Sequence, residues 1–242
     1  MDLVNREGSV SLQQLRDAFP AVSDVTLRKD LSYLDATMQL VRTHGGAKSV
    51  PSAIGMVDNF YTRISANTDA KNTIAQKAAS LLKPGISVYL APGTTCLALA
   101  KVFPDVKIQV FTDGIATAME LARHTNVETT VFGGDLDISS LRTHGPRFFS
   151  DVSSMHFDFA ILSADSFRPE HGFICCNDYY WNLLKTIREH TDTLVILLDS
   201  SKINTVRSAR FFPTELIDIV VSDGNFDKNT QDALKKANVT VL

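Results

Sequence analysis

The feature that most constrains the fold is a regular alternation of strand-like and helix-like segments from Lys71 to the end of the chain. The strand-like runs are short, apolar throughout and rich in β-branched residues, as in strands buried on both faces. Strands joined through helices run parallel, so residues 71–242 are predicted to form a Rossmann-like, mostly parallel α/β domain. The strand-like runs are ISVYL, KIQVF, TTVF, DFAIL, TLVILL, DIVVS and VTVL, and the helical segments lie near residues 72–82, 95–102, 114–123, 180–189 and 228–237.

The first 50 residues follow a different pattern, with two short predicted helices. Ser11 and Ser23 can each cap a helix, because a serine hydroxyl accepts a hydrogen bond from a free backbone N–H of the first turn. Pro20 ends the first helix, so a four-residue turn separates the two. This arrangement is typical of a helix-turn-helix, although generic two-helix hairpins share it. The apolar stripes are Leu12, Leu15 and Phe19 in the first helix and Leu27, Leu31 and Leu34 in the second.

An extended segment, residues 38–47, follows the second helix and contains Gly45 and Gly46. Glycine tolerates positive φ, so the pair allows a tight reversal between two strands, and we predict a small β-wing. The segment after the wing contains Pro, Ser and Gly without a sustained apolar period, which is typical of a linker. The predicted domains are a winged helix-turn-helix over residues 1–50, a linker over 51–70 and the α/β domain over 71–242.

Charge and hydropathy exclude several function classes. The net charge of −3 argues against a general nucleic-acid coat protein. The longest strongly apolar run, residues 194–198, is far shorter than the ~20 residues that cross a bilayer. The N-terminus has no signal-peptide pattern, so we expect a cytoplasmic protein with no membrane partner. The three cysteines lack metal-site spacing and the histidines are scattered, so reduced thiols and no metal or cofactor are predicted.

Basic residues gather in one part of the first 50 residues, although this segment carries six basic and six acidic groups in all. Four of the six basic groups fall between Arg28 and Lys48, where only two acidic residues oppose them. The leucine stripe of the second helix turns Thr26, Arg28 and Lys29 toward solvent, where such side chains can bond guanine edges or phosphates. Taken alone, the helix favours a simpler interpretation, which is a solvated charged face.

Two segments together carry a family resemblance: SDVTLRKDLSYLD at the second helix and LVRTHGGA at the wing. They resemble the winged helix-turn-helix of the DeoR family of bacterial transcription regulators. The resemblance implies that Thr26, Arg28 and Lys29 contact double-stranded operator DNA from a recognition helix, and that Arg42 and His44 add contacts from the wing. Lys29 stands where the family more commonly has arginine.

A turn with the composition of an anion site follows the run ISVYL. Gly93, Thr94 and Thr95 lie between this strand and an apolar helix. Free backbone N–H groups and the positive end of a helix attract phosphate, and the two hydroxyls add hydrogen-bond donors. An ordinary strand-to-helix turn, with glycine for its backbone shape and threonine as a cap, is equally compatible with this sequence.

Further polar turns follow other predicted strands and contain Asp113, Gly133, Gly134 and Asp165. Lys202 adds a cation after the run TLVILL, where the alternative is a solvated lysine. Open α/β sheets gather ligands at the carboxyl ends of their strands. We therefore expect these turns to lie along one edge of the sheet.

These turns resemble the C-terminal sensor domain of the DeoR family, whose fold is related to ribose-5-phosphate isomerase and which senses sugar phosphates or similar metabolites. The aromatic run Tyr179-Tyr180-Trp181 stands where the family often has an acidic and a small residue. The matching segments are Gly93-Thr94-Thr95, Thr112-Asp113 (commonly Thr-Asn in the family), Gly133-Gly134, Gly145-Pro146, Gly172 and Asp199-Ser200-Ser201-Lys202. The effector-binding residues that the resemblance implies are Lys71, Gly93, Thr94, Thr95, Asp113, Gly133, Gly134, Asp165 and Lys202.

The resemblance implies a transcriptional regulator, most often a repressor, of a sugar-metabolism operon that responds to a phosphorylated sugar. One small winged domain contacts too few phosphates and bases for a tight specific site, so we expect a homo-oligomer. The alternative is an enzyme of the sugar-phosphate isomerase type, with Asp165 as candidate base. Residues 163–167 (SADSF) and 172–174 (GFI) lack the acid–base residues that these isomerases have, so no catalytic residue is predicted.

Overall fold

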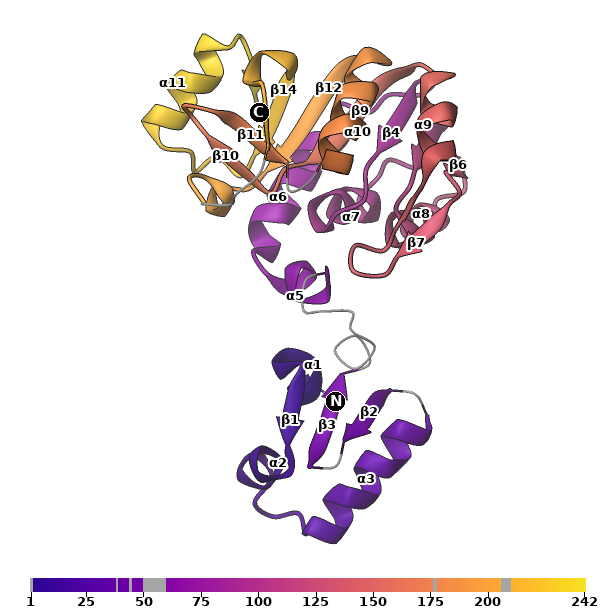
Figure 1. Cartoon of the computed structure of the whole chain (residues 1–242), viewed down its shortest axis with the longest axis vertical. Helices are drawn as coiled ribbons and strands as arrows, with labels where there is room; N and C mark the ends of the chain where they lie inside the picture. The colour runs from indigo at the N-terminus through magenta and orange to yellow at the C-terminus, as the bar shows by residue number, and fades with distance from the viewer. Residues whose placement is uncertain (1, 38, 44, 50–59, 176–177, 206–209) are drawn as a thin grey trace. The chain divides into compact units, whose positions relative to one another are not determined.

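The computed structural model describes residues 2–37, 39–43, 45–49, 60–175, 178–205 and 210–242 (Figure 1). The chain divides into two compact units, Met1–Ala66 and Asn67–Leu242. The described part of the predicted linker contains the helix α5 (Phe60–Ser65) and the beginning of α6 (Thr68–Ala79).

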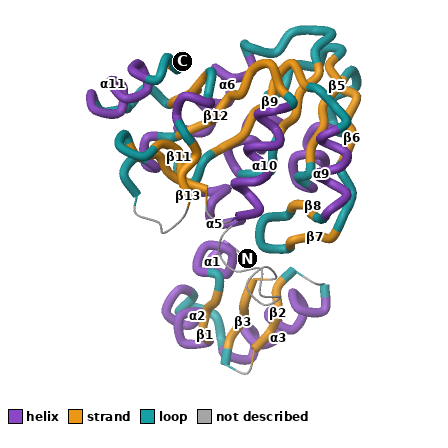
Figure 2. The backbone as a smooth tube through the Cα atoms, turned by 45° about the horizontal axis from the view of Figure 1, so that its top comes forward, coloured by secondary structure: helices purple, strands orange, loops and turns teal. Residues whose placement is uncertain are grey.

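The N-terminal unit is a winged helix-turn-helix, as predicted (Figure 2). Ser11 and Ser23 cap α2 and α3, each hydroxyl accepting a backbone N–H at 3.2 Å. The three strands form an antiparallel sheet in the order β1-β3-β2, and a small apolar core joins it to the helices. The elements are α1 (Asp2–Glu7), β1 (Ser9–Ser11), α2 (Leu12–Ala18), α3 (Asp24–Ala36), β2 (Leu40–Thr43) and β3 (Gly46–Ser49).

One position of the predicted apolar stripes is wrong. Leu15 is buried, but Phe19 follows the end of α2 and is 46% exposed. Pro20 stops the helix at this point, so Phe19 no longer lies on the helical face that Leu15 occupies. The second stripe is confirmed, because Leu27 and Leu31 are buried and Leu34 packs against the same core.

The larger unit is built on a seven-stranded sheet in which every neighbouring pair is parallel, which confirms the predicted Rossmann-like class. The strand order is β15-β14-β12-β9-β4-β5-β6. The strands β5 and β6 follow β4 on one side of it, whereas β9, β12, β14 and β15 follow one another on its other side. The strand order therefore reverses between β4 and β9, which is the topological switch point. The strands are β4 (Ser87–Leu90), β5 (Ile108–Thr112), β6 (Val127–Val131), β9 (Phe157–Ser163), β12 (Thr191–Leu198), β14 (Ile219–Ser222) and β15 (Thr240–Val241).

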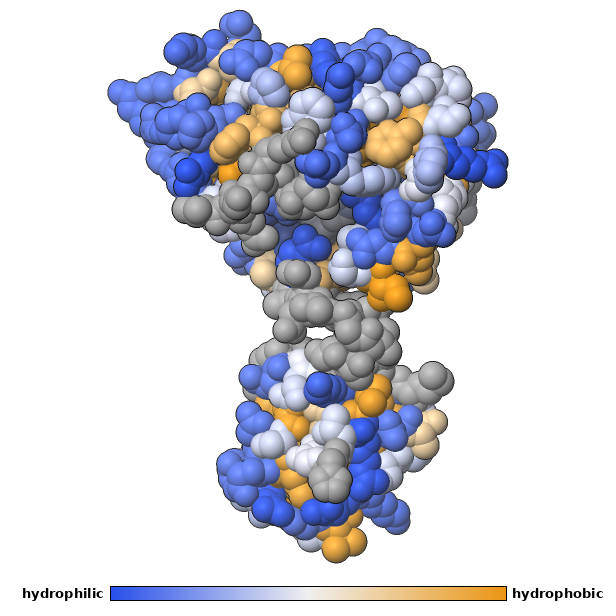
Figure 3. Space-filling model, viewed as in Figure 1, coloured by the Kyte–Doolittle hydropathy of each residue, from blue (hydrophilic) through white to orange (hydrophobic). Residues whose placement is uncertain are grey.

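Helices cover both faces of this sheet (Figure 1). Right-handed crossovers place α7 and α8 on one face and α9 and α10 on the other, because the strand order reverses between them. The face shown in Figure 3 is mainly hydrophilic with small apolar patches. No described helix is long and apolar enough to cross a membrane. The helices after α6 are α7 (Thr94–Lys101), α8 (Ile115–Leu121), α9 (Pro146–Ser153), α10 (Asp178–Glu189) and α11 (Lys228–Lys236).

Short antiparallel strands, which the sequence analysis did not predict, flank the main sheet. β7 pairs with β8, while β11 lies between β10 and β13. A short 3-10 helix, η1, follows β12 and includes Lys202. The strands are β7 (Asp135–Asp137), β8 (Arg142–His144), β10 (Ser166–Arg168), β11 (Gly172–Cys175) and β13 (Arg210–Phe212), and η1 spans Ser200–Lys202.

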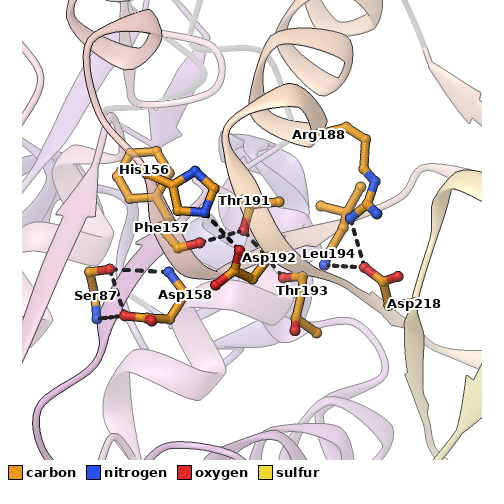
Figure 4. Close-up of polar contacts among 10 residues, drawn as sticks. All are labelled: Ser87, His156, Phe157, Asp158, Arg188, Thr191, Asp192, Thr193, Leu194 and Asp218. Carbon is orange, nitrogen blue, oxygen red and sulfur yellow. Dashed lines mark hydrogen bonds and ion pairs between the residues drawn. The ribbon is translucent and has the colours of Figure 1, made fainter.

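Two carboxylates link strands at the amino-terminal edge of the sheet (Figure 4). Asp158 of β9 accepts hydrogen bonds from the backbone N–H of Ser87 at 2.7 Å and from its hydroxyl at 2.8 Å, which joins β9 to the start of β4. Asp218 accepts the backbone N–H of Leu194 at 2.7 Å and a guanidinium N–H of Arg188 at 2.8 Å. These contacts fix the register of neighbouring parallel strands.

Replacing Asp158 with Asn is expected to lower the free energy of unfolding at neutral pH by about 1–3 kcal/mol, because two hydrogen bonds to a carboxylate are weakened. The Ser87 donors hold the pKa of Asp158 below its usual range. A lowered folded pKa stabilises the fold above the unfolded pKa of about 3.9, and this stabilisation is lost as the pH falls through the folded value. Wild type should therefore lose more stability than Asp158→Asn on acidification below pH ~4.

Urea unfolding followed by circular dichroism, at neutral and acidic pH, measures both effects. Asp192→Asn is the matched control, because this carboxylate pairs with His156 at 2.8 Å on a surface where both side chains are more than half exposed. Exposed pairs of this kind contribute little. Equal losses for the two variants would show that the contact between Asp158 and Ser87 does not stabilise the sheet.

Candidate functional site

The outer face of α3 carries the residues predicted to contact DNA. Thr26, Arg28 and Lys29 are all exposed, and the buried Leu27 and Leu31 fix the orientation of the helix. The N-terminal turn of α3 is held by Ser23, whose hydroxyl also lies 2.9 Å from the Thr26 hydroxyl. An outer face with exposed basic residues near the capped N-terminus, here Arg28 and Lys29, is the surface that enters the major groove in helix-turn-helix proteins.

The wing residue Arg42 is tied to α3. Its backbone N–H donates to Asp35 at 3.0 Å, and its guanidinium donates to the Ser32 hydroxyl at 2.8 Å. The predicted DNA contact by Arg42 would therefore be made from a side chain already held against the recognition helix. His44, the other predicted wing contact, lies outside the described residues.

The sequence analysis missed two exposed apolar side chains on α3. Val25 is 77% exposed and Tyr33 is 67% exposed. An exposed valine can contact a thymine methyl group, which is a common apolar contact in the major groove. The helical spacing of the leucine stripe could have identified both residues, because they lie opposite it.

The turn between β4 and α7 lies at the topological switch point of the sensor sheet. Gly93 has φ +136°, and a Cβ atom there would lie 2.8 Å from the Ser163 hydroxyl at the end of β9. Thr94 and Thr95 begin α7 and are 9% and 1% exposed. The Thr95 hydroxyl is buried with no hydrogen-bond partner among the described residues. The turn therefore brings free helix N–H groups and an unsatisfied hydroxyl close to the end of β9.

Lys202 lies on the other side of the switch point, in η1 after β12. Its ammonium donates to the Ala164 carbonyl at 2.8 Å and lies 3.7 Å from an Asp199 carboxylate oxygen. The Ala164 contact places this cation against the segment that carries Asp165, which is half-buried. The structure thus brings Gly93, Asp165 and Lys202 to the ends of neighbouring strands, as predicted for one sheet edge.

The start of α6 reaches the same strand end. The side-chain amide of Asn67 donates to the Ser201 hydroxyl at 2.7 Å and to Asp199 at 3.5 Å. Lys71, one turn further along α6, is 5% exposed. This burial is unusual for a lysine. The role of Lys71 in effector binding stays a prediction.

Asp113 lies beneath the surface. Its carboxylate is fully buried, accepts the Tyr89 hydroxyl at 2.8 Å and forms an ion pair with Arg142. Both carboxylate oxygens are therefore used by the protein, and direct contact with an effector stays a prediction. Arg142 was missed by the sequence analysis, because only the pairing of β8 with the turn after β5 brings it to this place.

Gly133 and Gly134 are exposed and follow β6 at the far edge of the sheet, two strands away from β4. Gly134 has φ +147°, and a Cβ atom there would lie 2.3 Å from the His144 carbonyl oxygen. This glycine is required by the β7–β8 pairing. The structure does not place these two glycines beside Gly93, so their role as effector contacts stays a prediction.

Burial holds one thiol and two phenols near the switch point in their neutral forms. Burial raises the pKa of the Cys96 thiol to about 12 and raises those of Tyr89 and Tyr180 above their usual range. A thiol with so high a pKa is a poor nucleophile. Within the described ranges, no group of three or more His, Cys, Asp or Glu side chains is arranged to hold a metal ion.

Two segments of the chain match known domains. Residues 1–53 match the DeoR-like helix-turn-helix domain, and residues 66–224 match the DeoR C terminal sensor domain. The regulator GolR of Listeria innocua is 31% identical over 221 residues, which cover 91% of this chain and 87% of that protein. The putative aga operon transcriptional repressor of Escherichia coli O157:H7 is 30% identical over 241 residues, which cover 99% of this chain and 89% of that protein. The chain belongs to the DeoR family of DNA-binding transcriptional regulators.

Similarity to solved structures is weaker. Ribose 5-phosphate isomerase A from Methanocaldococcus jannaschii aligns with a TM-score of 0.42 and 16% identity, covering 57% of this chain and 55% of that chain. The translation initiation factor eIF-2B from Pyrococcus horikoshii aligns with a TM-score of 0.49 and 12% identity, covering 92% of this chain and 89% of that chain. At these levels neither structure bears on the activity of this chain.

Gly93→Ala is expected to destabilise the sensor unit by about 1–3 kcal/mol, because alanine is strained at this positive φ. Gly133→Ala is the matched control, since no atom lies within 4 Å of a Cβ added there and the residue does not have the positive φ of Gly93. Thermal unfolding of the two variants measures the difference. Equal melting temperatures would contradict the role assigned to Gly93.

Arg28→Ala is expected to weaken operator binding by about tenfold or more, because it removes a charged contact from the outer face of α3. Fluorescence anisotropy with a duplex selected by the wild-type protein from a random library, at several salt concentrations, measures this loss. Arg123→Ala provides the control, because this arginine is an exposed residue of the sensor unit. If Arg28→Ala binds as tightly as Arg123→Ala, Arg28 is not a DNA contact.

Proposed function

We propose that this DeoR-family regulator controls a sugar-metabolism operon and responds to a phosphorylated sugar bound at the carboxyl edge of the sensor sheet. The observation that carries the proposal is the switch point between β4 and β9. In open α/β sheets, the connections that follow the two strands at such a point run in opposite directions. Ligands bind in the crevice that this leaves at the carboxyl ends of the two strands. The turn that begins at Gly93 and the segment around Asp165 lie at this place.

The chemistry of the turn favours a phosphate. The first N–H groups of α7 have no partner within the helix, and the helix dipole adds positive potential. Thr95 supplies a buried hydroxyl without a partner among the described residues. Lys202 supplies a cation that is partly exposed, with 24% of its side chain accessible. These groups together fit the oxygens of a phosphate monoester.

The names of related proteins support a sugar-responsive role. The E. coli relative is called an aga operon transcriptional repressor, and a relative in Lactococcus lactis that is 30% identical over 69% of this chain is called a lactose phosphotransferase system repressor. We propose that this chain is likewise a repressor. An effector that binds two states of the protein unequally shifts DNA affinity, with a coupling of roughly 1–3 kcal/mol expected.

We also propose that the protein acts as a homo-oligomer, because one winged unit reads only a single half-site. Two features support this. β6 is an edge strand of the sheet, so its outer hydrogen-bonding groups face no strand among the residues that the structure describes. Exposed apolar residues gather in the elements around it, where Figure 3 shows an apolar patch near β7. They are Met119, Val131, Leu136 and Ile138.

The site is proposed to bind its ligand without converting it. Lys202 is held in place by the Ala164 carbonyl and the Asp199 carboxylate, so it provides a fixed cation for binding. The family membership favours a regulator over an enzyme. Purified protein is therefore expected to leave ribose 5-phosphate unconverted, and measurable turnover that depends on Asp165 would contradict this part of the proposal.

Thermal unfolding in the presence of sugar phosphates and their unphosphorylated sugars tests the proposal directly, because a ligand that binds the native state raises the melting temperature. A rise with a phosphorylated sugar and none with its parent sugar is expected. Lys202→Gln should weaken that binding by about tenfold or more, since it removes a charge-assisted hydrogen bond. Lys101→Gln, at an exposed position of α7, is the control. A panel without any melting shift would contradict phosphate sensing.

A further inference from the structure

The guanidinium of Arg142 is a deeply buried cationic group next to the proposed effector site. Arg142 begins β8 and is 6% exposed. It bridges to Gly114, directly after Asp113 at the end of β5. The proposed function does not use this side chain, and its position could not be predicted from the sequence.

Protein groups hold one edge of this guanidinium. Its Nε donates to Asp113 at 3.0 Å, and its Nη2 donates to the same carboxylate oxygen. The other carboxylate oxygen accepts the Tyr89 hydroxyl at 2.8 Å. The guanidinium carbon lies 5.3 Å from the ring centre of Tyr179 and 5.1 Å from that of Tyr180. Its orientation is therefore fixed by an ion pair and by two aromatic rings.

The remaining nitrogen, Nη1, makes no hydrogen bond to any described residue. An arginine has five N–H donors, and two of them lie on Nη1. These two donors are therefore not used by the described part of the protein and are available to an acceptor on a ligand.

The position of this group relative to the phosphate turn is set by Gly114. A Cβ atom on Gly114 would lie 3.0 Å from Pro92, the residue before Gly93. Arg142 thus approaches the turn from the β5 side, while Lys202 approaches the switch point from the β12 side. The backbone of Arg142 therefore lies close to the turn that carries Gly93.

We propose that Arg142 reads the sugar part of the effector, donating from Nη1 to one of its hydroxyl or carbonyl oxygens, and that Asp113 and Tyr89 are positioning residues. This inference rests on the proposed function, because it assumes that the phosphate occupies the turn at Gly93. The Asp113 carboxylate already neutralises the guanidinium, so a neutral oxygen fits better than a second phosphate. The effector class is a sugar monophosphate.

The test compares the affinities of inorganic phosphate, ribose 5-phosphate, fructose 6-phosphate and glucose 6-phosphate for the full-length protein by calorimetry. Wild type should bind at least one sugar phosphate tighter than inorganic phosphate. In the paired variant Asp113→Asn/Arg142→Gln, that preference should fall by about tenfold or more, while affinity for inorganic phosphate stays within about twofold. Both charges are removed together because a lone buried Asp113 carboxylate would unfold the site.

Arg147→Gln is the matched control, since this side chain is 86% exposed on the adjacent α9 and should leave the preference unchanged. Arg142→Lys is a second variant that keeps the charge and loses the planar fork, so it should lose the preference even if the paired variant folds poorly.

The outcomes separate the two proposals. If wild type binds neither phosphate nor any sugar phosphate, the proposed function fails and this inference falls with it. If wild type prefers a sugar phosphate and both Arg142 variants keep that preference, only the assignment of Arg142 is overturned. Equal binding of phosphate and all three sugar phosphates by wild type also overturns it.

Discussion

The pairing of β4 with β9 is the contact on which the sensor unit depends. These strands are separated by three helices and four strands along the chain, yet they lie side by side at the centre of the sheet. Their amino ends are joined through Ser87 and Asp158, and their carboxyl ends diverge into Gly93 on one side and Asp165 on the other. The amino ends of the pair are thus held together by hydrogen bonds, while the carboxyl ends separate and leave room for a ligand. A doubly wound sheet creates this asymmetry whatever ligand it binds.

The N-terminal unit has few residues with which to stabilise its fold. Its core is small, so the hydrogen bonds that cap α2 and α3 contribute a larger share of its stability than caps do in the sensor unit. The leucine stripe of α3 also fixes which residues face outward. Burial of one face of the helix therefore determines which side chains the opposite face presents to solvent.

The sequence predicted the parts of the fold that depend on local pattern. Apolar runs located the seven parallel strands, and serines at helix starts located the caps of α2 and α3. It did not predict β10, β11 and β13, because strands of three or four residues contain too little alternation to be recognised, and β13 pairs with a strand that lies far back along the chain. Phe19 shows a related limit, since helical spacing continued to a residue at which the helix had already ended.

Some residues of the candidate site could likewise be predicted from local pattern, and others could not. Gly93, Thr94 and Lys202 follow strands that the sequence revealed, so their shared edge could be predicted. Arg142 could not, because its position depends on β8 meeting the turn that follows β5. Asp113 was assigned by its place after a strand, but its burial under Arg142 appears only in three dimensions.

The buried pair of Asp113 and Arg142 restricts how this chain can evolve. Losing either partner alone leaves an uncompensated buried charge, which typically costs about 3–5 kcal/mol. That loss is comparable to a large part of the net stability of many domains. A change at one position therefore has to be accompanied by a change at the other, or be preceded by mutations that stabilise the fold. Natural selection therefore acts on the two residues together, because a substitution at either position alone destabilises the folded protein.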